Sequence, residues 1–430
     1  MHARCALVLI ALPLLGSCTP KPHVADWAVV QELTPAFLQK PGTTDPNLAV
    51  GEGGQVALTW VVRDTTGGAD VWVAVSSDSG SAFGAPVRLN PKPGTVSSYI
   101  ESRPVVAFAP SGKLVVVWAA KRDSGLYAAD LVSRASTDGG RTFAPEAYLN
   151  SDHGDPLSTY HGFVALTFLA DGRAVAAWID GRGSPGLDEP MAGEIYASVS
   201  ADGGGQWASD TRVASDVCAC CRITLAAERS GHEPALLALA YRGMRGNLRD
   251  PRLATLRTDS LGVLSDTLVS ADHWFLRGCP SVGPSITYER SGGGHYLWFT
   301  GESATDGTAP PKLTPPGVHL VAWRAESGAT GPRRAMSDSL RDATRPVLAD
   351  LGQATLIGVI GHPRADSARA VLAVRMLDPN GELGPWLFLG SGVRGAALAG
   401  AHPNLAYAAW VEKDKDEPRV RVARIGRRRR

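Results

Sequence analysis

Seven short, mostly apolar segments recur along the chain, separated by polar and glycine-containing stretches. They lie at residues 56–60, 114–118, 174–178, 236–241, 296–299, 354–360 and 405–410, and six of them end in an aromatic side chain. Most are spaced by roughly sixty residues, which indicates a repeated supersecondary unit. The segments alternate poorly between apolar and polar residues, which is typical of strands in sheets that are packed on both faces.

The pattern of each repeat predicts a short strand, a turn, the apolar second strand, a charged loop and a final hairpin. This pattern predicts an all-β chain that forms a single β-propeller of four-stranded blades, with seven blades favoured and six as the alternative. The last repeat is short, because residues 420–425 can form its third strand and the chain then ends. Residues 27–33 can supply the missing fourth strand, and closing the ring in this way removes exposed sheet edges.

Composition agrees with a folded all-β chain. Hydrophobic residues make up 44% and charged residues 20% of the 430 residues, which are ordinary values for a globular protein. The 48 glycines and 30 prolines are spread along the chain, as many tight turns require. The formal net charge of +1 gives no electrostatic reason to expect nucleic acid as a partner, and we expect a monomer.

The N-terminus has the features of a targeting segment. Residues 5–15 form an apolar run, which is the length of a signal-peptide core and too short to span a bilayer. The run ends in Leu15-Gly16-Ser17-Cys18, which resembles the lipobox of bacterial lipoproteins, in which the cysteine is lipidated. A plain signal peptide with a chance cysteine is the alternative.

The lipobox resemblance implies an exported protein that is anchored in the inner or the outer membrane, its partner, through the lipid on Cys18. The anchored chain would face the periplasm or the cell surface. The expected organisation is a signal peptide at 1–18, a tether and closing strand at 19–44, the propeller at 45–426 and a basic tail at 427–430.

Three repeats carry a sharper motif. Residues 76–83, 136–143 and 200–207 all fit S-x-D-x-G-x-x-[FW]. The motif resembles the Asp box, or BNR repeat, of sialidases, where the aspartate accepts backbone N–H bonds, the glycine has positive φ and the aromatic residue packs into the blade. The resemblance implies a structural role for the following residues: Asp78, Gly80, Asp138, Gly140, Asp202 and Gly204.

Propeller topology places the loop before each first strand and the loop after each second strand on one face, around the mouth of the central channel. These loops are rich in arginines and carboxylates. An arginine can bind a carboxylate with two parallel hydrogen bonds, so the ring is a candidate site for an anionic sugar or another small carboxylate. Ion pairs between adjacent blades would use the same residues. The anion-binding candidates are Arg103, Arg122, Arg182, Arg242, Arg249 and Arg345.

The cysteines cluster in two such loops, at Cys218, Cys220 and Cys221 and at Cys279, and His161 opens the preceding unit. Three interpretations remain open. Two disulfides suit an oxidising compartment, although four cysteines allow three pairings. Thiolates with an imidazole would suit Zn²⁺ or Cu(I). One disulfide with a reactive thiol pair is the third interpretation.

Together with the Asp boxes, the stretches Cys218-Ala219-Cys220-Cys221, Tyr241-Arg242 and Gly278-Cys279-Pro280 resemble a group of exported bacterial proteins labelled exo-α-sialidase or sialidase-like. A sialidase needs three arginines, a tyrosine nucleophile with a glutamate partner, and an acid/base aspartate. The family's arginine stretch before the first Asp box is absent, and Ser102-Arg103-Pro104 follows that box.

No catalytic residue is therefore assigned. We expect a membrane-anchored propeller that binds a small molecule, sugar, protein or soft metal ion at the channel mouth. The alternatives are an exo-α-sialidase-type glycoside hydrolase, in which Tyr160, Tyr241 and Glu302 would have to supply the nucleophile pair, and a structural or partner-docking propeller whose cysteines act as staples.

Overall fold

The computed structural model describes residues 27–123, 127–155, 160–182, 192–228, 235–289, 292–303, 311–365, 369–414 and 417–427. The predicted lipidation site Cys18 and the last three residues of the basic tail lie outside these ranges. The regular secondary structure of the described residues consists of β-strands and one short 3-10 helix, η1 (Ala36–Gln39), so the all-β prediction is confirmed. None of the described helices is long and apolar enough to cross a membrane.

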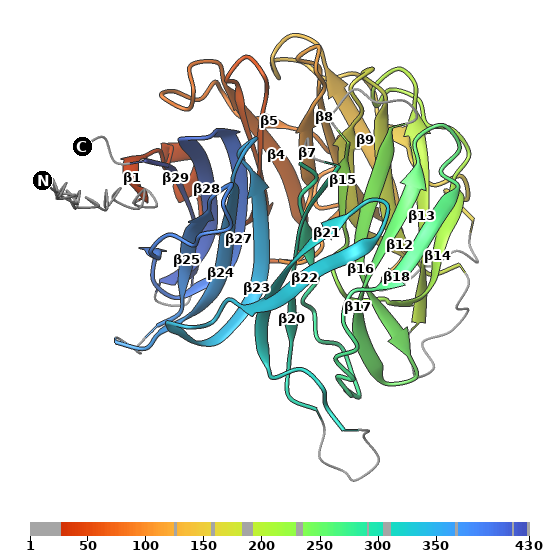
Figure 1. Ribbon diagram of the computed structural model, residues 1–430. Helices are drawn as coiled ribbons and strands as arrows, with labels where there is room; N and C mark the ends of the chain where they lie inside the picture. Colours follow the sequence, from red (N-terminus) through yellow and green to blue (C-terminus); the bar gives the residue numbers. More distant parts are fainter. Residues whose placement is uncertain are drawn as a thin grey trace, which may run out of the picture.

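The strands form consecutive antiparallel sheets (Figure 1). The first contains β2 (Thr43–Val50), β3 (Val56–Arg63), β4 (Ala69–Ser76) and β5 (Val87–Arg88). The second contains β6 (Val96–Ser97) and β7 (Val105–Phe108), which both pair with β8 (Leu114–Lys121), followed by β9 (Ala129–Ser136) and β10 (Ala147–Tyr148). The third contains β11 (His161–Phe168), β12 (Ala174–Asp180), β13 (Ala192–Ser200) and β14 (Thr211–Cys218).

A single residue pair, Val217 with Gly243, joins β14 to the next group of strands. That group contains β15 (Thr224–Ala227), β16 (Leu236–Arg245), β17 (Leu248–Arg257) and β18 (Val263–Leu268). Then follow β19 (Ser285–Ile286), β20 (Gly293–Thr300), β21 (Gly317–Arg324) and β22 (Gly328–Ala335), and after them β23 (Leu340–Asp350), β24 (Thr355–Pro363), β25 (Val371–Leu377) and β26 (Leu387–Leu389).

The last sheet combines the two ends of the described chain. It contains β27 (Val393–His402), β28 (Leu405–Asp414), β29 (Glu417–Arg427) and, on the outside of β29, the first strand β1 (Trp27–Glu32). In Figure 1 the red β1 accordingly lies beside the blue β29. Trp27 pairs with Arg427 and Glu32 with Ala423, so the N-terminal strand occupies the outer position that β5 or β14 occupies in its own sheet.

The seven apolar segments of the sequence lie in the second strands β3, β8, β12, β16, β20, β24 and β28, apart from Ala354, which immediately precedes β24. The first strand of each group contacts the first strand of the next, and β27 contacts β2. Separate hydrophobic clusters fill the spaces between consecutive sheets, including the space between β28 and β3, where Tyr407 and Trp60 belong to one cluster. Burial on both faces explains why these strands show no alternation of apolar and polar residues.

The three Asp-box segments form turns with one hydrogen-bond pattern. In the second turn, Ser136 Oγ donates to Asp138 Oδ1 (2.8 Å), Gly140 N donates to Ser136 Oγ (2.9 Å), and Thr142 N donates to Asp138 Oδ1 (3.0 Å). The turns around Asp78 and Asp202 repeat these bonds.

The glycines at the fifth position of the motif, Gly80, Gly140 and Gly204, all have positive φ, as expected of a residue without a side chain. They also pack closely against another sheet. A Cβ atom on Gly140 would lie 2.5 Å from Cγ2 of Val75, and one on Gly204 would lie 2.6 Å from Cγ2 of Val115. Each of these turns therefore rests on the sheet that precedes it, a role that the motif alone does not reveal.

Candidate binding site at the channel mouth

A cavity of about 270 Å³ lies where the first strands of the sheets meet. Its wall takes one or more residues from each of β2, β7, β11, β15, β19, β23 and β27, represented by Leu48, Val106, Ala165, Leu225, Ser285, Leu348 and Leu398. The strands contribute mainly apolar side chains. The charged side chains of the lining, Glu101, Arg103 and Arg222, come from the segments just before the first strands.

Glu101 is the centre of a buried charge network. Its Oε1 accepts a 2.8 Å hydrogen bond from Arg345 Nη1, and its Oε2 accepts one of 3.2 Å from the backbone N–H of Gly283. Arg222 Nε lies 3.9 Å from the same Oε2. Arg222 also donates to the carbonyl of Pro346 at 2.7 Å, so its guanidinium is held in place by backbone as well as by charge.

Arg103 completes the network and lies against strands β2 and β27. It is buried, and its Nη1 donates to the carbonyls of Pro46 (3.1 Å) and Ala396 (2.8 Å). Burial, followed by the repulsion of Arg222, lowers the pKa of Arg103 to about 10, against the attraction of Glu101. We call Glu101, Arg103, Arg222 and Arg345 the channel network. It has three guanidinium groups for one carboxylate, so an excess of positive charge faces the cavity.

The pKa of the Glu101 carboxyl reflects the same imbalance. Burial by itself would raise this pKa, but the charges of Arg222, Arg345 and Arg103 outweigh it and hold the pKa below its ordinary value. The carboxylate is therefore ionised at neutral pH and cannot act as a proton donor there.

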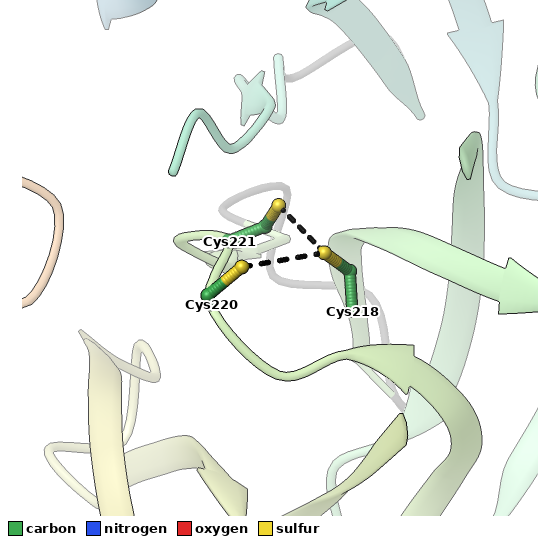
Figure 2. Close-up of side chains that lie close together, drawn as sticks. All are labelled: Cys218, Cys220 and Cys221. Carbon is green, nitrogen blue, oxygen red and sulfur yellow. Dashed lines mark hydrogen bonds between the residues drawn. The ribbon is translucent and has the colours of Figure 1, made fainter. Parts of the chain in front are cut away.

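The cysteines form a second cluster directly beside the channel network, since Cys221 precedes Arg222. Cys220 and Cys279 form a disulfide, which joins the segment before β15 to the segment before β19. Cys218 and Cys221 are free and buried, each only 1% exposed. Figure 2 shows the sulfur atoms converging: Cys218 Sγ lies 3.0 Å from Cys221 Sγ and 3.8 Å from Cys220 Sγ.

Two buried arginines lie next to these thiols. Arg242 stacks on the ring of Trp274 (4.9 Å) and donates from Nη2 to the carbonyl of Phe299 (2.7 Å), and its Nη1 has no hydrogen-bond partner in the described structure. Arg249 donates to the carbonyl of Gly278, beside Cys279. Within the described ranges neither guanidinium has a carboxylate at ion-pair distance.

The thiols of Cys218 and Cys221 differ in pKa. The hydrogen bond from Cys221 and the charges of Arg242 and Arg249 lower the pKa of Cys218 to about 7, against the effect of burial. Burial, together with the same hydrogen bond, raises the pKa of Cys221 well above its ordinary value. Cys218 is therefore the more acidic thiol of the pair and the one that ionises first.

His161 does not join the cysteines, contrary to the prediction that placed it in one metal or disulfide cluster with them. Its Nε2 lies 3.1 Å from Asp152 and 3.3 Å from Asp180, and its Nδ1 bonds the carbonyl of Ala129 (2.7 Å). The reason is that β11 begins next to β12, where Asp180 lies directly opposite His161 in the strand pairing.

Two carboxylates and an imidazole, those of Asp152, Asp180 and His161, lie close enough together to hold a metal ion. The guanidinium of Arg182, however, already lies against the same carboxylates. Arg182 Nη2 lies 2.7 Å from Asp180, 2.8 Å from Asp210 and 3.3 Å from Asp152. With Cys220 bonded to Cys279 and His161 paired to aspartates, the five predicted metal ligands are not assembled into one set.

The six predicted arginines likewise do not form one ring. Arg103 and Arg345 belong to the channel network, and Arg242 and Arg249 lie beside the cysteines. Arg182 joins the His161 aspartates, and Arg122 donates to the carbonyl of Asp155 (2.7 Å) with Asp130 at 3.8 Å. The prediction omitted Arg222, although its position just before a first strand, like that of Arg103, was a usable signal.

The tyrosines considered for a sialidase nucleophile have other partners. The hydroxyl of Tyr160 bonds that of Tyr99 (3.1 Å), and the hydroxyl of Tyr241 donates to Asp266 (2.6 Å). Glu302 is exposed and uses its backbone carbonyl to accept from Trp274. Neither tyrosine is therefore seen paired with a glutamate among the described side chains.

Comparison with known proteins identifies the fold. No family model matches the sequence, and no curated protein matches it. Among solved structures, the chain is similar to a Hadza microbial sialidase, with 16% identity, a TM-score of 0.53, and coverage of 91% of this chain and 67% of that one. It is also similar to a polysaccharide lyase (12% identity, TM-score 0.53, 89% and 90% coverage) and to a protein of unknown function from Dyadobacter fermentans (10%, 0.51, 94% and 99%). At these identities the likeness concerns the fold alone, which is that of a sialidase-like β-propeller.

Proposed function

We propose that this chain is an exported, membrane-anchored, sialidase-like propeller that binds an anionic small molecule, such as an acidic sugar, at the channel mouth without hydrolysing it. The observation that carries the proposal is the channel network, in which three guanidinium groups share the carboxylate of Glu101. Buried cations are stable when counter-charges pair with them, so an incoming carboxylate would supply the charge that the protein lacks.

We infer seven blades closed by the N-terminal strand as the frame of this site. The inference is supported by the cavity wall, which draws on seven first strands, and by the pairing of β1 with β29. The anchor rests on the lipobox resemblance at Cys18, and it implies that the binding face works outside the cytoplasm.

The hydrolase alternative has weaker support. Retaining hydrolysis of a sialoside needs a nucleophile and its partner beside the carboxylate-binding arginines. In the described structure Tyr160 bonds a second tyrosine and Tyr241 an aspartate of β18. Turnover of a fluorogenic sialoside that is lost in Arg103→Ala would favour the hydrolase over a binding protein.

Calorimetric titration tests the binding proposal. N-acetylneuraminic acid and glucuronic acid serve as probes, and their methyl esters serve as neutral controls. We expect the acids to bind with affinity that falls as salt rises, and the esters to bind at least about tenfold more weakly because the charged hydrogen bonds are lost. Equal binding of acid and ester, or binding of neither, would count against an anion site.

A variant pair assigns the binding to the channel network. Arg222→Met removes one guanidinium from the cavity wall, while Arg88→Met removes a guanidinium from outer strand β5, far along its sheet from β2. The first change should abolish detectable binding and the second should leave it intact. Thermal melts of both variants show whether a loss of binding reflects unfolding.

A further inference from the structure

The four sulfur atoms beside the channel network include both a disulfide and a dithiol. Cys218 and Cys221 are separated by two residues, and the backbone N–H of Cys221 donates to the carbonyl of Cys218 at 3.2 Å, so a tight turn holds the two thiols together. This is the C-x-x-C arrangement in which proteins commonly place an activated cysteine. The Cys220–Cys279 disulfide touches the pair through Cys220.

We propose that these cysteines form a two-electron relay in which the buried dithiol exchanges with the Cys220–Cys279 disulfide. The relay is separate from the anion binding proposed above, because it uses neither Glu101 nor the arginines around it. Its contact with solution is Cys279, the exposed member of the four, which a small thiol or a protein thiol can reach.

In the first step the Cys218 thiolate attacks Cys220 Sγ, 3.8 Å away. A bond forms between Cys218 and Cys220, the bond from Cys220 to Cys279 breaks, and its electron pair leaves on Cys279 Sγ. The hydroxyl of Ser281 lies 3.1 Å from Cys279 Sγ. Because a disulfide sulfur has no proton, Ser281 is the donor, and it is placed to stabilise the leaving thiolate.

In the second step Cys221, whose sulfur is 3.0 Å from that of Cys218, attacks Cys218 Sγ. A Cys218–Cys221 disulfide forms and Cys220 leaves as a thiolate, while the proton of Cys221 passes to one of the released thiolates. One disulfide and two sulfhydryl groups are present before and after, so the electrons balance without an added oxidant or reductant.

The charges around the site favour this direction of attack. Arg242 and Arg249 are buried cations without a carboxylate partner in the described structure, and their charges act on Cys218. An anionic sulfur at Cys218 supplies their counter-charge, which explains why two arginines are tolerated in a site lined by Cys218, Cys221 and Met244.

Tryptic peptides distinguish the two isomers. Cleavage after Arg212 and Arg222 places Cys218, Cys220 and Cys221 in one peptide, and cleavage after Arg277 and Arg290 places Cys279 in another. The starting isomer gives the two peptides cross-linked. The product isomer gives them separate, with an internal disulfide in the first peptide.

The experiment starts from the fully reduced chain, reoxidised with one equivalent of oxidised glutathione per chain and then incubated with a bulky maleimide that labels exposed thiols. In the wild type, exchange frees Cys279 and the maleimide labels it irreversibly. The chains therefore accumulate as the isomer in which Cys218 is bonded to Cys221. In Cys218→Ser the cross-linked peptides should persist, with labelling of Cys279 slower by at least about tenfold.

Cys221→Ser separates the two steps, because Cys279 is still labelled but the first peptide now carries a bond from Cys218 to Cys220. Ala219→Ser changes the same loop and keeps all sulfurs, so it should behave as the wild type. The relay is wrong if Cys279 in the wild type is labelled no faster than in Cys218→Ser. It is also wrong if the reduced chain takes up one Zn²⁺ per chain and shows no exchange once the metal is chelated.

Discussion

Arg345 Nη1 donates a 2.8 Å hydrogen bond to Oε1 of Glu101, although the two residues are 244 positions apart in the chain. The bond joins the segment before β7 in the second sheet to strand β23. Glu101→Gln keeps the shape of this side chain and removes the only carboxylate of the channel network. We expect the free energy of unfolding at pH 7 to fall by about 3 kcal/mol, because one buried and two partly buried guanidiniums lose their counter-charge.

Urea denaturation measures this change, and Glu52→Gln is the control because Glu52 is exposed. The pKa of Glu101 is lower in the folded chain, so its stabilisation is present above the ordinary carboxyl pKa and is lost as the pH falls through the folded value. The difference between wild type and Glu101→Gln should therefore shrink in acid. A difference that grew in acid would contradict this account.

Protonated His161 should make the free energy of unfolding fall as the pH rises into the alkaline range. Burial disfavours its charged ring, but the hydrogen bonds and charges of Asp152 and Asp180 outweigh burial and raise its pKa from 6.5 to about 9. The stabilisation is complete below about pH 6.5 and is lost as the pH rises through about 9, and it amounts to on the order of 3 kcal/mol. Unfolding curves of wild type and His161→Gln should accordingly differ most near pH 6 and converge toward pH 10.

His402→Gln is the matched control for that comparison, since His402 is exposed on the last sheet. Its unfolding free energy should track the wild type at every pH. A constant difference between wild type and His161→Gln from pH 6 to pH 10 would show that the protonated ring is not what stabilises this site.

Two adjacent glycines of one Asp-box turn should respond unequally to alanine. Gly139 and Gly140 both have positive φ, so either substitution costs about 1 kcal/mol of backbone strain. Only at Gly140 would the new Cβ also collide with Val75, at 2.5 Å, whereas nothing lies within 4 Å at Gly139. Gly140→Ala should therefore lower the melting temperature clearly more than Gly139→Ala, and equal effects would mean that contact with the preceding sheet is unimportant.

Breaking the disulfide should destabilise the chain through either cysteine. The bond closes a loop with a sequence separation of 59, for which loop-closure entropy predicts about 4 kcal/mol. Cys220→Ser, Cys279→Ser and the double variant all remove the same bond. Their melting temperatures should fall by similar amounts, and a double variant with twice the loss would assign separate stabilising roles to the two residues.

The second strands and the Asp-box turns could be predicted from the sequence because both depend on local patterns that recur. The environment of His161 could not, since Asp152 reaches it from a loop outside its own strand pair. The pairing of Cys220 with Cys279 was similarly undetermined, because neighbouring sulfurs in one short loop differ only in where the turn directs them. Arg222 was not predicted, because the chemistry of its loop was assigned to the neighbouring cysteines alone.

The disulfide also encloses a whole group of strands. The segment between Cys220 and Cys279 contains β15, β16, β17 and β18, so the covalent bond bypasses these four strands. A protease that cuts once in any loop of this segment leaves the two fragments attached, and the nicked chain migrates as one species in a denaturing gel until a reductant is added. In an environment rich in proteases, a cut within this group of strands therefore leaves the strands before it and the strands after it covalently joined.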